Sequence, residues 1–345
     1  MARRLFSILL LALAGRAGAA APYPAERFSF PSADGRLALS AVRIPSPHPG
    51  SVVVVVGGRS ESWLKYGPLF RDLRAAGYTV YSYDHRGQGL SPHFVPSHPQ
   101  IGHVDDFAMY GRDLGAFLRE VRRREQGATI HLIGHSMGAV VIVDCLAGSH
   151  DPDIGKIVLC SPMFFINTAP WPEPLARLLL GLLRLSGQGA GYAPGEHDIA
   201  PDEPFVKNRI TSSPEHWAET LEFRRQHPEA VTGGASVEWV AQAMDHAAAV
   251  RREAEALGPD TLILEAGRDS LVIPWIPSRR DGKPGPVVLL YPGSRHEILL
   301  EREPIRGHAV RSILSFLKGD VTAAPIPLDQ RGGKRLSSEH TPFIP

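Results

Sequence analysis

The sequence predicts an α/β protein with a mostly parallel central sheet flanked by helices. Apolar runs of strand length recur along the chain, amphipathic segments of helix length alternate with them, and a short hairpin signal precedes the first alternation. Strands that alternate with helices form parallel sheets, because each helix returns the chain to the same edge of the sheet. A chain of 345 residues can form one large domain with an insertion.

The elements follow in order from the N-terminal side. Residues 28–30 and 37–43 alternate around Asp34-Gly35, which predicts an antiparallel hairpin. The strands that follow are apolar throughout, as strands buried on both faces are. We expect them at residues 52–56, 79–83, 129–133, 157–160, 261–265 and 287–291. We expect helices at residues 66–76, 107–122 and 305–316.

The alternation of strand and helix patterns stops between residues 161 and 235. In this stretch prolines are frequent and segment 175–185 is strongly apolar. We expect this stretch to be a helical cap over the carboxyl edge of the sheet, where ligands bind in open α/β folds. The cap divides the core into residues 26–160 and 236–318. Residues 319–345 are rich in proline, glycine and charge, which predicts a disordered tail.

The first residues have the pattern of a secretory signal peptide. Residues 1–4 are positively charged, residues 5–14 are apolar, and the small residues 17–19 fit a cleavage site. The apolar stretch is shorter than the roughly 20 residues that cross a bilayer. We therefore expect residues 1–19 to be removed and the mature protein to be periplasmic or secreted. The alternative is a membrane anchor through an uncleaved N-terminus.

Charge and cysteine content exclude several classes of function. The formal net charge is +1 and no basic block is present, so no nucleic-acid partner is expected. No close histidine spacing indicates a metal site. Cys145 lies on a predicted helix that leaves the sheet edge where Cys160 ends a strand, so the two are expected to be free thiols.

The most informative motif is GHSMG at residues 134–138, which lies between an apolar strand and an apolar helix. A G-x-S-x-G sequence in this context predicts a nucleophile elbow, a sharp turn that projects the hydroxyl of Ser136 from the sheet. The turn also directs the first N–H groups of the helix at the atom that the serine attacks.

A serine nucleophile needs a base, and the base needs an orienting acid. Asp269 follows the strand at residues 261–265, and His296 follows the strand at residues 287–291. Both residues are expected at the same sheet edge as Ser136 and in the order serine, acid, histidine. His85 also follows a strand, but its loop is expected to have a structural role.

An oxyanion that forms at the substrate needs two donors. One expected donor is the backbone N–H of Met137. The other is the backbone N–H of Arg59, which follows Gly57-Gly58 in the loop after the first parallel strand. The alternative is that the two glycines only form a tight turn.

The apolar segment of the insertion predicts an amphipathic helix. Leu175, Leu178, Leu179 and Leu182 have the spacing of one helical face. We expect Leu179 and Leu182 to bind substrate, as part of an acyl-chain tunnel or of a surface that touches lipid. The alternative is a cap helix whose leucines only pack on the core.

Four stretches carry a resemblance to a known family: GRSESWLKY at 58–66, DHRGQGLS at 84–91, GHSMG at 134–138 and HEIL at 296–299. They resemble the bacterial lysophospholipase branch of the monoacylglycerol lipase family, over roughly residues 26–318. The resemblance implies an α/β-hydrolase fold with a cap, no cofactor, and hydrolysis of single-chain lipid esters. It also implies Ser136 as nucleophile, Asp269 as orienting acid and His296 as general base.

The sequence departs from that family at two places in the core. Gly57 stands where the lipases have a histidine, although the lysophospholipase-like branch also lacks it. The stretch from Asp269 to Pro286 is short and contains Pro274 and Pro277, so the helix expected there is reduced to a turn.

Together these patterns predict a serine carboxylic ester hydrolase that acts through an acyl-enzyme, as a lysophospholipase. The alternatives within the same chemistry are a monoacylglycerol lipase, a general esterase or a transacylase. The alternative from another class is a non-catalytic lipid-binding protein with the same fold. The expected partners are a small lipid ester and, transiently, a membrane surface. The sequence predicts no oligomeric state.

Overall fold

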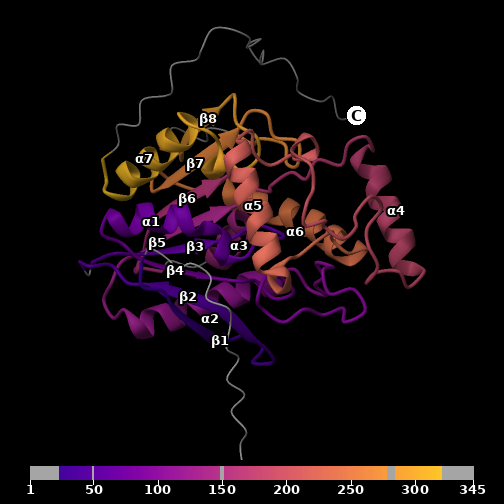
Figure 1. Cartoon of the computed structure of the whole chain (residues 1–345), viewed down its shortest axis with the longest axis horizontal. Helices are drawn as coiled ribbons and strands as arrows, with labels where there is room; N and C mark the ends of the chain where they lie inside the picture. Colours follow the sequence, from indigo (N-terminus) through magenta and orange to yellow (C-terminus); the bar gives the residue numbers. More distant parts are fainter. Residues whose placement is uncertain (1–22, 49, 148–150, 278–283, 321–345) are drawn as a thin grey trace, which may run out of the picture.

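The computed structural model describes residues 23–48, 50–147, 151–277 and 284–320. Within these ranges eight strands form one sheet in the order β1-β2-β4-β3-β5-β6-β7-β8 (Figure 1). The strands are β1 (Glu26–Pro31), β2 (Ala38–Ile44), β3 (Val52–Val56), β4 (Thr79–Tyr83), β5 (Ile130–His135), β6 (Ile154–Cys160), β7 (Thr261–Ala266) and β8 (Val287–Tyr291). β1 and β2 pair antiparallel, β2 pairs antiparallel with β4, and the remaining pairs are parallel. The predicted fold class is confirmed.

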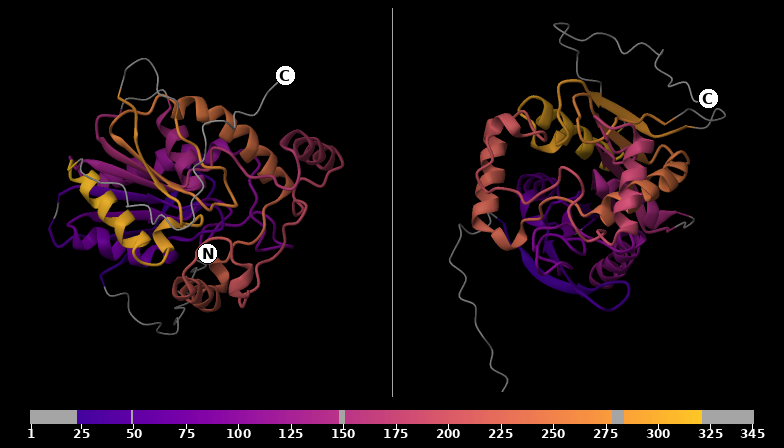
Figure 2. Two further views of the ribbon diagram at one scale, coloured as in Figure 1. Left: turned by 90° about the horizontal axis from the view of Figure 1, so that it is seen from above. Right: turned by 90° about the vertical axis from the view of Figure 1, so that its right-hand side faces the viewer.

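Helices cover both faces of the sheet. The α-helices are α1 (Gly67–Ala75), α2 (Ala108–Arg124), α3 (Met137–Leu146), α4 (Glu173–Leu185), α5 (Pro214–Gln226), α6 (Val237–Ala254) and α7 (Ile305–Leu317). The short 3₁₀ helices are η1 (Trp63–Tyr66), η2 (Phe205–Lys207), η3 (Pro228–Ala230) and η4 (Ile298–Leu300). α1 and α7 pack on one face of the sheet, and α2, α3 and α6 pack on the other (Figure 2).

The central strand β3 shows why this segment is continuously apolar. Side chains alternate between the two faces of a sheet. Val52, Val54 and Val56 pack with α2 and α3, whereas Val53 and Val55 pack with α1 and α7. All five valines are buried, so no position on this strand tolerates a polar residue without loss of stability.

The stretch between β6 and α6 contains α4, η2, α5 and η3. α4 lies at the periphery of the molecule (Figure 1). It packs against α6 through a small apolar cluster that includes Leu180, Val237 and Met244. Between β7 and β8, residues 267–277 and 284–286 contain no helix, in agreement with the turn expected there.

Several expectations concern the ends of the chain. The predicted signal peptide at residues 1–19 lies outside the described residues, as do residues 321–345 of the predicted tail. Among the described helices, none combines the length and hydropathy of a membrane span.

Cys145 and Cys160 are both free thiols, as expected.

Candidate active site

Ser136 occupies a strained turn between β5 and α3. Its φ of 52° and ψ of −114° lie in a region that non-glycine residues rarely adopt. The turn requires glycine on both sides. A Cβ at Gly138 would lie 2.2 Å from the carbonyl oxygen of Val56, and one at Gly134 would lie 2.8 Å from the backbone nitrogen of Ala139. The close approach of strand and helix therefore fixes the position of Ser136.

Asp269 and His296 form a hydrogen-bonded pair in the loops that follow β7 and β8. The Nδ1 atom of His296 lies 2.6 Å from the Oδ2 atom of Asp269. The other carboxylate oxygen accepts hydrogen bonds from the backbone N–H groups of Leu271 and Val272, at 2.8 and 3.0 Å. Burial would raise the pKa of Asp269, but the hydrogen bond and charge of His296 hold it below its usual value.

The serine and the histidine open onto the same cavity. Ser136 and His296 both line a cavity of about 790 Å³. Asp269 lies behind His296, so the three residues predicted from the sequence come together at the carboxyl edge of the sheet. Ser161 braces this arrangement, because its hydroxyl donates a hydrogen bond of 2.8 Å to the carbonyl oxygen of His296.

The two expected oxyanion donors flank the serine. Met137 is the first residue of α3, and the first N–H groups of a helix lack a carbonyl partner within that helix. In the loop after β3, a Cβ at Gly58 would lie 3.2 Å from the Cβ of Ser136. Arg59 follows Gly58, and its guanidinium donates a hydrogen bond of 2.9 Å to the carbonyl oxygen of Gly233. The loop is thus held close to Ser136.

Three helices, α4, α5 and α6, contribute apolar side chains to the cavity, and Trp217 and Phe223 are those of α5. Leu179 and Leu180 from α4 line it, together with Val240 and Met244 from α6. Leu182 is 56% exposed and does not line the cavity.

The predicted substrate-binding role of Leu182 in a tunnel is therefore wrong, and the predicted single face of α4 divides in two. At 100° per residue, Ala176, Leu179, Leu180 and Leu183 form one arc that faces α6 and the cavity. A second arc faces away from the core and consists of Leu175, Leu178, Leu182 and Leu185. The spacing of leucines alone did not separate the two arcs, because α4 is apolar on more than half of its circumference.

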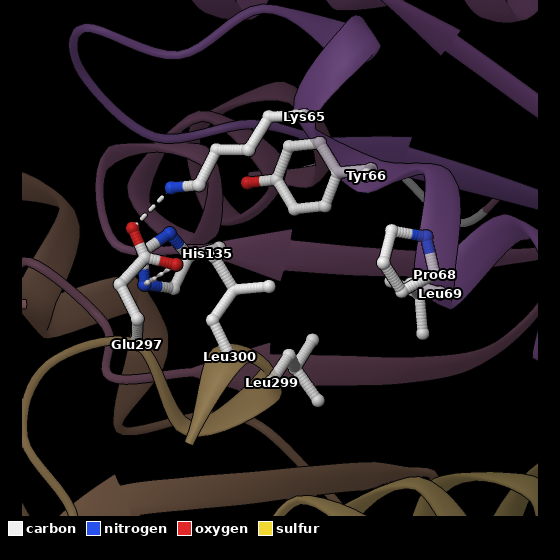
Figure 3. A pocket seen from close by; sticks show the side chains of 8 residues that line it. All are labelled: Lys65, Tyr66, Pro68, Leu69, His135, Glu297, Leu299 and Leu300. Atoms are coloured by element: carbon white, nitrogen blue, oxygen red, sulfur yellow. Dashed lines mark hydrogen bonds and ion pairs between the residues drawn. The ribbon is translucent and has the colours of Figure 1, made fainter. Parts of the chain in front are cut away.

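A buried charged network joins three segments of the chain, and Figure 3 shows its members Lys65, His135 and Glu297. Lys65 contacts Glu61 at 2.6 Å and also contacts Glu297. The Nδ1 atom of His135 lies 3.1 Å from the Oε1 atom of Glu61. The Oε2 atom of Glu61 accepts a hydrogen bond from the backbone N–H of Gly58. The network thus connects the loop that carries Gly58 and Arg59 to the residues adjacent to Ser136 and His296.

Burial and the neighbouring opposite charges act in opposite directions on the pKa values of His135, Lys65 and Glu61. Burial would lower the pKa of His135, but the carboxylates of Glu297 and Glu61 raise it to about 9. Burial would also lower the pKa of Lys65, and the same two carboxylates raise it. The pKa of Glu61 lies well below its usual value despite its burial, because Lys65 and His135 stabilise the carboxylate.

The same residues include a set of types that bind metals. Ligand atoms of Glu61, His135 and Glu297 lie within 4.8 Å of one another. The ammonium group of Lys65 contacts both carboxylates and supplies the positive charge at this point. We therefore assign the cluster to charge pairing and not to metal binding.

The network predicts a pH dependence of stability. His135 has an ordinary pKa of 6.5 and a folded-state pKa of about 9, so the fold binds its proton more tightly than the unfolded chain does. The resulting stabilisation is complete below about pH 6.5 and is lost as the pH rises through about 9. Denaturant unfolding across this range is expected to show a steeper loss of stability in the wild type than in His135→Gln. Parallel profiles for the two proteins would contradict a charged His135.

Sequence analysis did not identify this network. Its members lie in three of the stretches that carry the family resemblance, at residues 58–66, 134–138 and 296–299. The spacing of Glu61 and Lys65, four residues apart, is typical of an exposed helical ion pair. Only the fold shows that the pair is buried and meets His135 and Glu297.

The comparisons with known proteins agree with this geometry. Residues 47–303 match the family described as serine aminopeptidase, S33. Lysophospholipase L2 of Escherichia coli is 31% identical over 284 residues, which cover 80% of this chain and 82% of that protein. Among solved structures, a soluble variant of monoglyceride lipase from Saccharomyces cerevisiae, in complex with a substrate analogue, is similar with a TM-score of 0.63 and 18% identity. The alignment covers 87% of this chain and 99% of the yeast chain.

A thermostable carboxyl esterase from Bacillus coagulans, in complex with glycerol, is similar with a TM-score of 0.62 and 18% identity, over 86% of this chain and 99% of that one. At this level of identity the two solved structures support the fold, whereas the family match covers most of the chain. The protein therefore belongs to the family described as serine aminopeptidase, S33, in the lysophospholipase branch of the α/β-hydrolase superfamily.

Proposed function

We propose that the protein is a lysophospholipase in which Ser136, His296 and Asp269 form the catalytic triad. The observation that carries the proposal is the position of Ser136. It lies in a strained turn, at the wall of a cavity that His296 also lines and to which α4, α5 and α6 contribute apolar side chains. The relationship to lysophospholipase L2 supports a single-chain lipid ester as the substrate.

The geometry supports acyl transfer in two steps. The Oγ atom of Ser136 attacks the ester carbonyl carbon while His296 accepts the serine proton. Because Asp269 engages Nδ1 of His296, Nε2 is the nitrogen left for this transfer. His296 then returns the proton to the oxygen of the departing alcohol, which leaves the fatty acyl group on Ser136. Water attacks this acyl-enzyme with His296 again as base, and the fatty acid is released.

The oxyanion that forms in each step carries a negative charge beside the turn. The backbone N–H groups of Met137 and Arg59 are proposed to donate hydrogen bonds to it. A Cβ at Gly58 would lie 3.2 Å from the Cβ of Ser136, so glycine at this position lets the loop of Arg59 come close to the serine. Donors of this kind stabilise the transition state by about 3–4 kcal/mol each.

A hydrolysis panel tests the substrate assignment. Purified protein is given a lysophospholipid, a monoacylglycerol with the same acyl chain, and a short soluble ester. We expect the highest kcat/KM for the lysophospholipid. Higher kcat/KM for the monoacylglycerol would assign the protein as a monoacylglycerol lipase. Acyl transfer to an added alcohol that exceeds release of fatty acid would assign it as a transacylase. Turnover of none of the three would support a non-catalytic lipid-binding protein.

The exposed arc of α4 supports a second part of the proposal, a transient contact with a lipid surface. Leu178, Leu182 and Leu185 of this arc are each more than half exposed, and so is Trp171, which precedes α4. Their neighbour Leu179 on the same helix lines the cavity. An apolar surface that adjoins a lipid-binding cavity favours contact with the interface from which the substrate is drawn.

Two substitutions on α4 are expected to separate these roles. Leu179→Ser is expected to lower kcat/KM for a long-chain lysolipid far more than for a short ester, because an acyl chain gains about 0.8 kcal/mol per buried methylene. Leu182→Ser is expected to leave both rates on dispersed substrate unchanged and to weaken binding to phospholipid vesicles. The measurements are chain-length kinetics and vesicle flotation. Equal losses for long and short substrates in Leu179→Ser would show that this leucine only stabilises the helix.

A further inference from the structure

Among the charged side chains that line the cavity, the carboxylates all form ion pairs but two of the cations do not. Four carboxylates line it, and each contacts a cation: Glu61 and Glu297 contact Lys65, Glu196 contacts Arg59 at 3.5 Å, and Glu203 contacts Arg224 at 3.3 Å. Lys207 and Arg209 also line the cavity. Within the described part of the chain, neither of these two cations has a carboxylate partner.

Arg209 contacts the loop that carries Asp269. Its guanidinium donates one hydrogen bond of 3.1 Å to the hydroxyl of Ser270 and another to the carbonyl oxygen of the same residue. Both acceptors are neutral, and Ser270 directly follows Asp269. These contacts orient the guanidinium without cancelling its charge.

The segment that carries the two cations is also held against the loop of His296. The backbone N–H of Glu297 donates a hydrogen bond of 2.8 Å to the carbonyl oxygen of Ile210. The Arg295 guanidinium donates to the carbonyl oxygens of Asn208 and Thr211, at 2.7 and 3.1 Å. Lys207 and Arg209 therefore lie on the histidine side of the cavity, whereas α4 and α6 contribute apolar side chains to it.

This division matches the two ends of a lysophospholipid. The histidine protonates the departing alcohol, so the alcohol part of an ester lies on the side of His296. In a lysophospholipid that alcohol carries a phosphate a few bonds from the scissile ester. Phosphate is bound by arginine and lysine, whose charge and N–H donors it accepts.

We propose that Lys207 and Arg209 form a subsite for the phosphate of the lysophospholipid headgroup, and that this subsite distinguishes lysophospholipids from monoacylglycerols. The inference rests on the proposed function and deepens it. Phosphate lies between the two cations, and the acyl chain extends along α4 and α6. A monoacylglycerol places only neutral hydroxyls at this position and gains no charge–charge interaction.

The test uses two non-hydrolysable single-chain ligands, of which only one carries a phosphate. Hexadecylphosphocholine and a hexadecyl glycerol ether are measured as competitive inhibitors of short-ester hydrolysis, below their critical micelle concentrations. In the double variant Lys207→Gln/Arg209→Gln, the inhibition constant of the phosphocholine is expected to rise on the order of tenfold, as the loss of two partly exposed charge contacts warrants. The inhibition constant of the ether is expected to stay unchanged.

Arg252→Gln is the matched control, because Arg252 is an exposed cation of α6 that does not line the cavity. It is expected to leave both inhibition constants unchanged. Equal weakening of the two inhibitors in the double variant, or no weakening of either, would overturn the subsite. Failure of the proposed function would be seen separately: wild-type protein would not hydrolyse lysophospholipid, whichever way the inhibitor pair behaved.

Discussion

Ser136→Ala and His296→Ala are each expected to lower kcat by several orders of magnitude, and the double variant is expected to lose little more. The serine and its base act as one unit, so removal of either stops formation of the acyl-enzyme. Asp269→Asn is expected to be somewhat milder, because the base remains but is poorly oriented. Steady-state kinetics on a soluble ester measure all four variants.

Ser186→Ala is the control for this series, because Ser186 is an exposed serine just after α4. Thermal unfolding of each variant separates loss of the fold from loss of chemistry. Retention of more than about a tenth of wild-type activity in Ser136→Ala would contradict the nucleophile assignment.

Lys65→Met is expected to give the largest loss of stability. Lys65 is the ammonium group between the buried carboxylates of Glu61 and Glu297, and its removal leaves uncompensated negative charge in the core. Breaking a buried ion pair in this way costs about 3–5 kcal/mol. Because Glu61 also accepts the N–H of Gly58, kcat is expected to fall even at temperatures where the variant is folded. Denaturant unfolding and kinetics on a short ester measure the two effects.

Lys156→Met is the matched control for this substitution. Lys156 forms a 2.5 Å ion pair with Asp260, whose side chain is 73% exposed. Exposed pairs of this kind contribute about 0–1 kcal/mol, so the control is expected to remain close to the wild type. Similar losses of stability in the two variants would contradict the role of Lys65 as the counter-ion of two buried carboxylates.

The fold could be predicted from the sequence because its strands carry a strong local signal. β3 consists of five valines, and a run this apolar is buried on both faces wherever it occurs in an α/β protein. Boundaries were less accurate at β6, which was expected at residues 157–160 and spans Ile154–Cys160. The helix expected at residues 66–76 agrees with α1 (Gly67–Ala75) to one residue at each end, and the 3₁₀ helix η1 (Trp63–Tyr66) precedes it.

Some site residues could likewise be predicted from the local sequence, whereas others depend on contacts between distant segments. Ser136, Asp269 and His296 each follow a strand, so topology alone brings them to one edge of the sheet. The partition of α4 depends instead on where α6 packs, which no pattern within residues 173–185 records. Lys207 and Arg209 lie in a stretch without strand or helix periodicity, and the contacts of this stretch with Ser270 and Glu297 form only in the folded chain.

The central claim is that Ser136 forms the covalent intermediate, and labelling with a fluorophosphonate tests it most directly. The probe phosphonylates an activated serine through the same attack that the ester undergoes. Intact-mass measurement is expected to show a single adduct on the wild-type protein, peptide mapping is expected to place it on Ser136, and Ser136→Ala is expected to remain unlabelled. An adduct on another serine, or hydrolysis by a folded wild-type protein that the probe leaves unmodified, would contradict the account.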